Sequence, residues 1–555
     1  MTLDQSIKEM LRGLEANPHD EQHQKKAADA LSKHPDAVFN VIKGEANRTL
    51  SAPGQPSGPG APQPNADTVW VNCIGQQECT PLEQVKPQSL KDLVDIVIEA
   101  RKQKQRVRAV GSGHAFSDVA RTDGAVLVSP VLLDRVSDVE SDLLRESVAG
   151  QKLIHVQSGI LVQNLITELT NRGLALINEG GYTGQTISGT LSTGTHGSGI
   201  TFGPLASFAR SIVLVSETGT VYQIEPADGI TDPAKFSGVI DGVEVTLKQD
   251  DEWFNAVVVS MGCMGVIYAF TMEVCDAFSI KELRSSTTWD KIKGSLEPSK
   301  WDPVPPIISS FDHFELVLNP YHIFFRNACV TVERTRLGNV PAQGQRQDWL
   351  SAVLEQASID NAPELVAILN AIPFISPIVI DQAIMTLVEK KPYIDKSYNV
   401  LSLGEANDLK ALALELHCDA TQCVPTIDKL LTVFQEEAKE HDWYLAGPLA
   451  IRFTAPSNAF LAPESGRMTC TMELDMLVGA KTGEELLRHM KEKICTSDSS
   501  STRVHWGLDL DFVTKDDIRN WYPNFERWNK VYQELNSEGM FNNKFTDRVG
   551  ISTPE

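Results

Sequence analysis

The stretch GQTISGTLSTGTHGSG, residues 184–199, constrains the fold more than any other part of the chain. It holds five glycines and seven hydroxyl side chains, and a second small-residue loop, GSGHAFSD at 111–118, follows the apolar run RVRAV. Glycine accepts positive φ angles and lets backbone N–H groups approach a ligand closely. Successive N–H groups in such turns bind anions, and Ser and Thr hydroxyls add further donors. The two loops together predict a site for a pyrophosphate that carries a large organic group.

Neither loop is a standard nucleotide-binding fingerprint. GSGHAF lacks the third glycine of GxGxxG, and neither loop ends in GK[ST], so the Rossmann and P-loop classes are excluded. Either glycine loop alone would more often be an ordinary turn than a cofactor site. Two such loops in one chain, each following a predicted strand, favour the cofactor site.

Length and composition limit the classes of protein further. A chain of 555 residues is expected to form two or more domains. Its 73 acidic and 50 basic residues give a formal net charge of −23, which disfavours nucleic acid as a partner. The nine cysteines are scattered without metal-type spacing, so we expect reduced thiols and no metal site. Cys73 and Cys79 could pair only in an oxidising compartment.

The sequence indicates no signal peptide and no stable membrane span. Residues 1–14, MTLDQSIKEMLRGL, carry charges throughout. The most apolar segment, LVAILNAIPFISPIVI at 365–380, is too short for a span and contains two prolines. We expect a packed helix pair there, with a membrane-touching patch as the alternative. The expected location is the cytoplasm or another intracellular soluble compartment, with peripheral membrane association left open.

The local pattern divides the chain into segments. Residues 1–66 read as a helical appendage, beginning with an amphipathic helix and ending in the Pro/Gly-rich linker SAPGQPSGPGAPQPNAD. The segment 67–275 alternates helices and strands, which indicates an α+β domain. There Ser89 is predicted to cap one helix, and Ser158 to begin another that ends at Gly173.

The rest of the chain predicts a second domain and a returning tail. Residues 276–502 contain strands such as HFELVLN, together with long helices. Residues 503–555 read as a strand, then the helix YPNFERWNKVYQELN, then a loop.

Four motifs occur in the order typical of one family: RVRAVGSGHAFSDVARTDGAVLV, GYTGQTISGTLSTGTHGSG, SMGCMGVIYAFTMEV and RVHWG. From about residue 68 to the C-terminus the chain resembles the sugar-1,4-lactone and alditol oxidases, which include the L-gulono- and D-arabinono-1,4-lactone oxidases. These are FAD enzymes of the vanillyl-alcohol-oxidase fold. The resemblance implies a two-subdomain FAD-binding domain of the PCMH type at 67–275. It also implies a substrate (cap) domain at 276–502, with an antiparallel sheet flanked by helices, and a C-terminal segment at 503–555 that returns to the FAD domain.

The resemblance also implies how FAD is held. His114 would carry the flavin covalently through its 8α-methyl group; the alternative is a turn histidine beside tightly bound, non-covalent flavin. The second loop has no cysteine, so a single covalent bond is expected. The implied cofactor-binding residues are Gly111, Ser112, Gly113, His114, Ala115, Ser117, Thr186, Ser188, Gly189, Ser192, Thr193, Gly194, His196, Gly197, Val266 and Asn543.

On the substrate side, Arg452 and His505 are the implied catalytic residues. Arg452 would orient the substrate hydroxyl or stabilise negative charge, and His505 would accept a proton or simply pack beside Trp506. The family's Glu-x-Arg motif has Ala450 in place of glutamate, and its HWG-Lys motif has Leu508 in place of lysine.

Two acidic pairs stand near these positions. Glu473 and Asp475, like Asp509 and Asp511, alternate in a way that predicts one strand face for each pair. They would either make the pocket acidic, with Arg452 as its one cation, or line a solvated face.

The implied reaction is oxidation of a CH–OH group of a sugar lactone, polyol or related alcohol. Hydride would pass to flavin N5 and two electrons then to molecular oxygen, giving hydrogen peroxide. The alternatives are a dehydrogenase with a quinone or cytochrome acceptor, and a flavin-binding protein without catalysis. The sequence does not indicate an oligomeric state.

Overall fold

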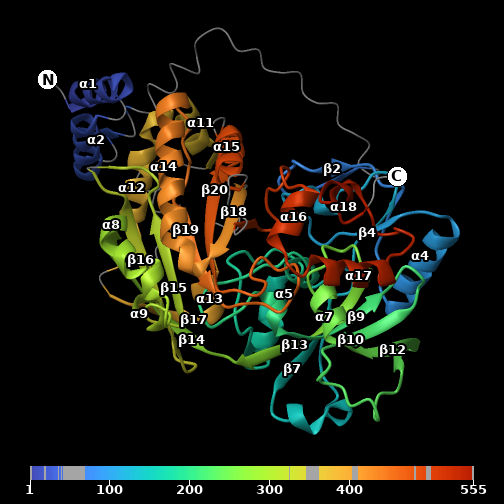
Figure 1. The fold of residues 1–555 in the computed structure, drawn as a ribbon. Coiled ribbons are helices and arrows are strands. Elements are labelled where there is room, and N and C mark those ends of the chain that lie inside the picture. The colour runs from blue at the N-terminus through green and yellow to red at the C-terminus, as the bar shows by residue number, and fades with distance from the viewer. Residues whose placement is uncertain are drawn as a thin grey trace.

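The structure is a computed structural model (Figure 1). It describes residues 3–17, 20–34, 37–38, 41, 69–323, 325–344, 362–389, 391–402, 411–480, 483–495 and 502–552. The Pro/Gly-rich linker predicted from Ser51 lies outside the described residues, as does the end of the predicted helical region near Asn47. The N-terminal amphipathic helix is confirmed as α1 (Leu3–Ala16); it packs on α2 (Glu21–Lys33), which contacts α12 (Ser376–Thr386).

Residues 69–276 contain two main sheets and are called the FAD half below, after the cofactor that the family resemblance implies. Its first part is a small parallel sheet with one long helix. Its strands run in the order β3 (Glu83–Val85), β5 (Val126–Val128) and β4 (Val107–Ala109). Ser89 caps α4 (Leu90–Lys102) by accepting from the Asp92 N–H, as predicted. Apolar side chains of α4 share a core with this sheet and with β9 and β13 of the next one. A short hairpin-like pair, β1 (Trp70–Val71) and β2 (Glu78–Cys79), precedes it.

The second part of the FAD half is a mixed sheet, eight-stranded over the described residues. Its order is β11-β12-β10-β9-β13-β7-β6, with β8 paired to β13. The bounds are β6 (Val136–Asp138), β7 (Lys152–Gln157), β8 (Leu174–Ala175), β9 (Ala209–Val215), β10 (Val221–Glu225), β11 (Val239–Ile240), β12 (Val243–Gln249) and β13 (Val266–Asp276). Its helices are α5 (Val162–Asn171), α6 (Ile187–Ser192) and α7 (Asp251–Val257).

The predicted helix start at Ser158 is wrong by several residues. Helix α5 begins at Val162, because the Ser158 N–H pairs with the Tyr268 carbonyl and so prolongs the sheet. The predicted end at Gly173 is confirmed, since Gly173 follows the C-cap with φ +70°.

Residues 279–504 are called the substrate half below, after the role that the resemblance implies. They are built on an antiparallel sheet, which is again eight-stranded where the chain is described. Its order is β17-β14-β16-β15-β19-β20-β18-β21. The bounds are β14 (Ser279–Thr288), β15 (His313–Leu318), β16 (Ala328–Leu337), β17 (Tyr393–Lys396), β18 (Ala411–Asp419), β19 (Leu449–Thr454), β20 (Thr469–Leu477) and β21 (Arg503–Val504). Its helices are α8 (Trp289–Ile292), α9 (Pro306–Ser309), α11 (Ala362–Ala371), α12, α13 (Ser397–Leu401), α14 (Cys423–His441) and α15 (Gly483–Cys495).

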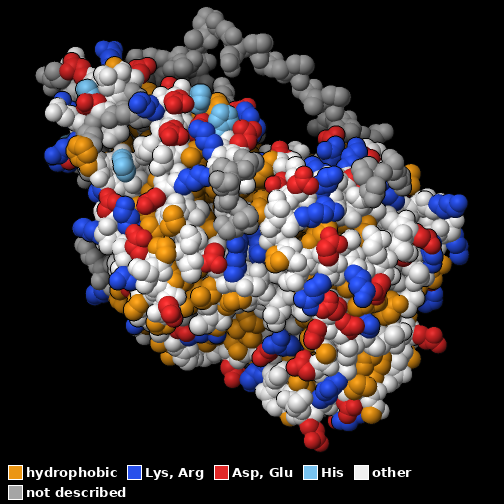
Figure 2. All heavy atoms as spheres, in the orientation of Figure 1, with side chains coloured by type: hydrophobic (Ala, Val, Ile, Leu, Met, Phe, Trp, Pro, Cys, Tyr) orange, Lys and Arg blue, Asp and Glu red, His pale blue; other side chains and the backbone are white. Residues whose placement is uncertain are grey.

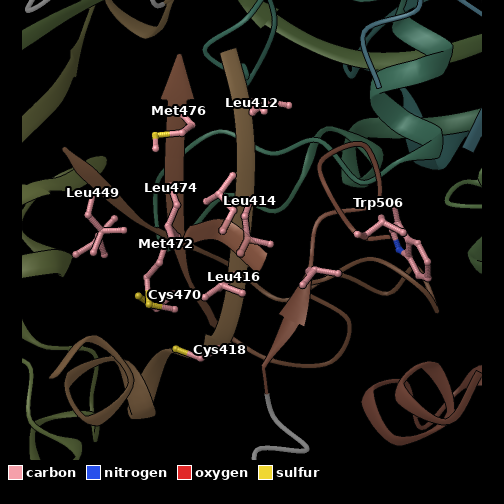
Figure 3. Packing of buried hydrophobic residues seen from close by; sticks show 14 of the residues in the cluster. Leu412, Leu414, Leu416, Cys418, Leu449, Cys470, Met472, Leu474, Met476 and Trp506 are labelled. Atoms are coloured by element: carbon pink, nitrogen blue, oxygen red, sulfur yellow. The ribbon is translucent and has the colours of Figure 1, made fainter. Parts of the chain in front are cut away.

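One face of this sheet is apolar and the other is charged. On the apolar face, α14 contacts β18, α15 contacts β20, and α12 contacts β16. Figure 3 shows Leu414 and Leu416 of β18 beside Met472 and Leu474 of β20 in this core. Side chains alternate along a strand, so the intervening residues lie on the opposite face, toward the FAD half.

The tail begins in the substrate sheet and ends in the FAD half. β21 pairs with β18, so residues 503–504 belong to the substrate sheet. The chain then forms α16 (Lys515–Trp521), α17 (Phe525–Leu535), which packs on α7, and α18 (Lys544–Arg548). The predicted final loop thus contains a short helix, α18, which begins with a capping box at its N-cap residue Asn543.

No single helix among the described residues is long and apolar enough to span a membrane. Two short helices, Leu365–Ala371 and Pro373–Thr386, have enough length and apolar character for a span only when taken together, and their axes are bent by 109° at the break between them. The predicted helix pair is therefore confirmed, and it buries Leu365, Ile378 and Ile380. Figure 2 shows acidic and basic side chains interspersed on the face in view, so the acidic excess is not gathered into one patch there.

We predict that Leu414→Ala destabilises the substrate half by about 2–5 kcal/mol, because it leaves a cavity in a closed core. Leu414 is fully buried and lies opposite Leu474 in the β18–β20 register. Denaturant unfolding followed by tryptophan fluorescence measures the effect. Lys91→Ala, on the exposed side of α4, is the control and should change stability by less than about 0.5 kcal/mol. Equal losses in the two variants would contradict this packing.

Candidate active site

The two glycine loops, the start of β13 and the segment after β21 surround one cavity of about 130 Å³. The loops are separated by more than sixty residues in the chain and are brought face to face by the two sheets of the FAD half. The predicted residues on its wall are Gly111, Ser112, Gly113, His114, Ala115, Thr186, Ser188, Gly189, Ser192, Thr193, Val266 and His505.

Glycine is required where the two loops meet. A Cβ at Gly111 would lie 2.0 Å from Thr186 Oγ1, so any side chain there would separate the loops. Thr186 is fixed in turn, because it caps α6 by accepting from the Gly189 N–H. Gly113 has φ +72°, a conformation that favours glycine. The cavity wall is therefore formed largely by backbone, as a ligand held by N–H groups requires.

His114 lies on the cavity wall with both ring nitrogens engaged. Its Nδ1 is 3.0 Å from Ser112 Oγ, and its Nε2 forms a hydrogen bond with Tyr182 Oη. The side chain is half-buried, and burial lowers the pKa of His114 below its usual value. The imidazole is therefore neutral at pH 7, as a nucleophile must be. Tyr182 was not among the residues predicted from the sequence.

Arg108 is a second residue that the sequence analysis missed. Its side chain is fully buried in the cavity wall, and its guanidinium donates to the carbonyls of Met261 (2.6 Å), Phe541 (2.9 Å) and Val119. Within the described residues it forms no ion pair with a carboxylate, and burial lowers its pKa. A buried charge without a counter-charge is costly, so this wall suits an anionic ligand. The signal in the sequence was a charged residue inside the buried run RVRAV.

Several predicted cofactor-binding residues stand behind the wall instead of on it. Ser117 Oγ donates to the Trp506 carbonyl at 2.8 Å, and Asn543 Nδ2 donates to the carbonyls of Val119 (3.1 Å) and Arg121 (3.0 Å). A Cβ at Gly194 would press on Pro463, and one at Gly197 on the Glu179 carbonyl. These residues hold the loops in place.

His196 also stands behind the wall, where it joins the two halves of the molecule. Its Nε2 lies 3.1 Å from Glu415 Oε1 on β18, and both side chains are buried. Burial alone would lower the pKa of His196, but the Glu415 carboxylate outweighs it and raises the pKa to about 9. His196 and His417 in turn hold the pKa of Glu415 well below its usual range, against the effect of burial. The second glycine loop is thus tied to the substrate sheet by a charged pair.

Arg452 lies among carboxylates on the charged face of the substrate sheet. It ion-pairs with Glu473, and its Nη1 is 3.7 Å from Glu415 Oε1. Glu315 lies directly opposite it in the β15–β19 register. These carboxylates raise the pKa of Arg452, although its burial acts in the other direction. Glu415 and Glu315 were missed from the sequence because they stand singly within apolar strands, where only the strand register shows what they face.

The acidic pair on β20 lies on the same side of the sheet as Arg452, although neither residue is among those that line the cavity. Glu473 contacts Arg452, and burial together with Glu473 raises the pKa of Asp475 well above its usual value. Glu473 also lies opposite Ala450 in the β19–β20 register. A carboxylate therefore reaches Arg452 from the neighbouring strand, although position 450 is alanine.

The prediction of a strand for Asp509 and Asp511 is wrong. Asp509 lies in irregular backbone and Asp511 in a turn, and each carboxylate is 2.7 Å from Nζ of Lys491, a buried residue of α15. The two aspartates alternate with apolar residues as in a strand, but both carboxylates contact the same lysine, Lys491.

His505 is buried at the end of the cavity, beside His196 and His417. Its Nδ1 accepts from the Gly507 N–H at 3.0 Å, which leaves the ring proton on Nε2. Burial lowers the pKa of His505 to about 3, so the ring is neutral. In this arrangement His505 offers a hydrogen-bond donor at Nε2.

Comparison with known proteins places this geometry in a class. Residues 81–225 match the family model described as an FAD binding domain. The cavity fits that group, because it combines a glycine cradle, hydroxyl donors and the buried guanidinium of Arg108, which has no carboxylate partner among the described residues. The chain is thus a flavin-dependent oxidoreductase in its architecture. Residues 270–549, half of the chain, match the D-arabinono-1,4-lactone oxidase model, and the chain belongs to that family.

Individual relatives agree with this assignment. An L-gulono-1,4-lactone dehydrogenase of Mycobacterium tuberculosis is 25% identical over 481 residues, covering 87% of this chain and 99% of that protein. An L-gulonolactone oxidase of Bos taurus is 23% identical over 486 residues, covering 86% and 97%. The solved cholesterol oxidase of B. sterolicum superposes with a TM-score of 0.64 at 13% identity, covering 88% of this chain and 99% of that one. The predicted vanillyl-alcohol-oxidase-like α+β fold is confirmed.

We predict that Arg108→Gln lowers flavin occupancy of the purified protein about tenfold, because the cavity loses its buried positive charge. The ratio of flavin to protein absorbance measures it. Arg108→Lys keeps the charge with fewer hydrogen-bond donors, so its flavin occupancy should lie between those of the wild type and Arg108→Gln. Full occupancy in Arg108→Gln would show that the charge is not needed.

We predict that the His196–Glu415 pair makes stability depend on pH. Because the pKa of His196 is raised in the folded protein, its contribution is fully present below about pH 6.5, the unfolded value. It is lost as pH rises through about 9. Thermal melts between pH 6 and 10 should therefore show a falling midpoint. The double variant His196→Gln/Glu415→Gln, which leaves no unpaired charge, should fall less; equal slopes would contradict the assignment.

Proposed function

We propose that the protein oxidises a CH–OH group of a sugar 1,4-lactone or a related polyol, with molecular oxygen as electron acceptor and hydrogen peroxide as product. The family assignment supports the lactone, since relatives are named for L-gulono- and D-arabinono-1,4-lactones. The observation that carries the proposal is the connection of Arg452, through Glu415 and His196, to the loop that lines the flavin cavity.

In this proposal FAD, when bound, supplies the two-electron acceptor for the substrate hydride. The residues implied from the sequence that line the cavity would bind it, and His114 would carry it by one covalent bond. His114 suits this role because it is neutral and lies on the cavity wall. A fixed attachment keeps the cofactor in place through many turnovers.

The chain's own residues would prepare the substrate for oxidation. Arg452, held by carboxylates on two sides, orients the hydroxyl and stabilises negative charge that develops on its oxygen. Glu473 supplies the carboxylate that the alanine at position 450 cannot, and it accepts a hydrogen bond from the substrate. His505, with its proton on Nε2, acts as a donor beside them.

The experiment is to mix the holoenzyme without oxygen with L-gulono-1,4-lactone, D-arabinono-1,4-lactone, xylitol and a hydroxy acid. We expect a lactone or the polyol to bleach the flavin, and peroxide to form when air is admitted. Arg452→Met should lower kcat/KM by about 10²- to 10³-fold, as loss of a charge-stabilising donor does. Arg452→Lys, which keeps the charge, should lose less.

The outcomes separate the alternatives. Dye reduction without peroxide would replace the oxidase with a dehydrogenase. A flavin that no member of the panel reduces would replace the enzyme with a flavin carrier. Unchanged kinetics in Arg452→Met would remove Arg452 from the site.

A further inference from the structure

Tyr182 is placed against the side chain that is proposed to carry the flavin. It stands just before the second glycine loop, and its Oη bonds to Nε2 of His114. The two rings also pack together, with centroids 4.7 Å apart and an angle of 47° between their planes. The contact therefore fixes the position of the imidazole and gives its Nε2 a hydrogen-bond partner.

The Tyr182 ring is itself held in place. It packs directly on the backbone of Gly184, where an added Cβ would lie 2.7 Å from Tyr182 Oη and 3.0 Å from Cζ. The hydroxyl on the other side of His114, Ser112 Oγ, is 3.0 Å from Nδ1 and belongs to a small side chain that turns about a single bond. One nitrogen of His114 thus faces a fixed partner and the other a movable one.

These contacts decide which nitrogen can react. A neutral imidazole has one N–H and one lone pair, and burial keeps His114 neutral. A nitrogen that forms a bond to carbon must hold the lone pair and must be released by its partner. Nδ1 satisfies both conditions when Nε2–H donates to Tyr182, because the Ser112 hydroxyl can turn away.

We propose that Tyr182 is the positioning residue for flavin attachment: it accepts the Nε2–H hydrogen bond of His114 and so directs Nδ1 to the flavin 8α carbon. The inference rests on the proposed covalent link. In the overall step one N–H bond of the imidazole and one C–H bond of the methyl group break, and one C–N bond forms. The two protons and two electrons so released pass to molecular oxygen, which becomes hydrogen peroxide. As the bond forms, positive charge grows on the ring, and Tyr182 Oη stabilises the Nε2–H that bears it.

The test follows attachment directly, without turnover. Purified wild type, Tyr182→Phe and the matched control Tyr222→Phe are incubated with FAD in air, and samples are precipitated with acid. Flavin in the pellet, and flavin fluorescence of the denatured band, give the covalent fraction over time. We expect Tyr182→Phe to attach flavin about tenfold more slowly, because it loses a hydrogen bond to a group that becomes charged. Tyr222→Phe, which removes a hydroxyl from a ring that packs on Trp253 and does not line the cavity, should attach flavin at the wild-type rate.

Other results would overturn the inference. Equal rates in Tyr182→Phe and wild type would remove Tyr182 from the step, and equal slowing in Tyr182→Phe and Tyr222→Phe would show that the effect is not specific to Tyr182. NMR of the flavin peptide released from wild type needs no variant: linkage through Nδ1 supports the inference and linkage through Nε2 overturns it. A wild-type pellet without flavin would instead disprove the covalent link itself, and with it this inference. Lactone turnover is a separate readout, so its failure leaves the attachment result standing.

Discussion

The buried ion pair between His196 and Glu415 is the contact on which the rest of the site depends. Neither charge could be buried alone without a large cost, and each moves the other's pKa toward the charged form. The pair lies where the second glycine loop meets β18, so it couples the loop that lines the cavity to the sheet that carries Arg452. One carboxylate therefore sets the relation between the cofactor side and the substrate side.

Strand pairing in the substrate sheet places the charged residues of its polar face side by side. Arg452, Glu473 and Glu415 stand on three adjacent strands, and antiparallel register brings them together. The alanine at position 450 leaves room beside Arg452 that Glu473 uses from the neighbouring strand. Arg452 therefore has a carboxylate partner on β20, although position 450 of its own strand is alanine.

Much of the fold and part of the site could be predicted from the sequence. The glycine loops, the capped helix at Ser89 and the end of α5 at Gly173 depend on local backbone preferences, which neighbouring residues reveal. About half of the residues of the cavity wall followed from motifs. Glu415 could not be predicted, because its partners come from distant strands and a loop.

The errors have the same origin. Asp509 and Asp511 alternate like strand residues, but they lie outside the strands, where both carboxylates contact Lys491 of α15. Arg108 and Tyr182 act through contacts with residues that only the folded chain brings near. Local pattern therefore predicts elements well, whereas the chemistry of the site depends on which elements meet.

The wall around Arg108 also has a consequence for biosynthesis. One of its guanidinium contacts is the Phe541 carbonyl, and the Val107 N–H bonds to the Met540 carbonyl, more than four hundred residues later in the chain. While the ribosome is still translating the substrate half, the cavity lacks the segment 540–541 that contacts Arg108 and β4. Residues 540–541 can therefore dock on β4 only after more than four hundred further residues have been synthesised.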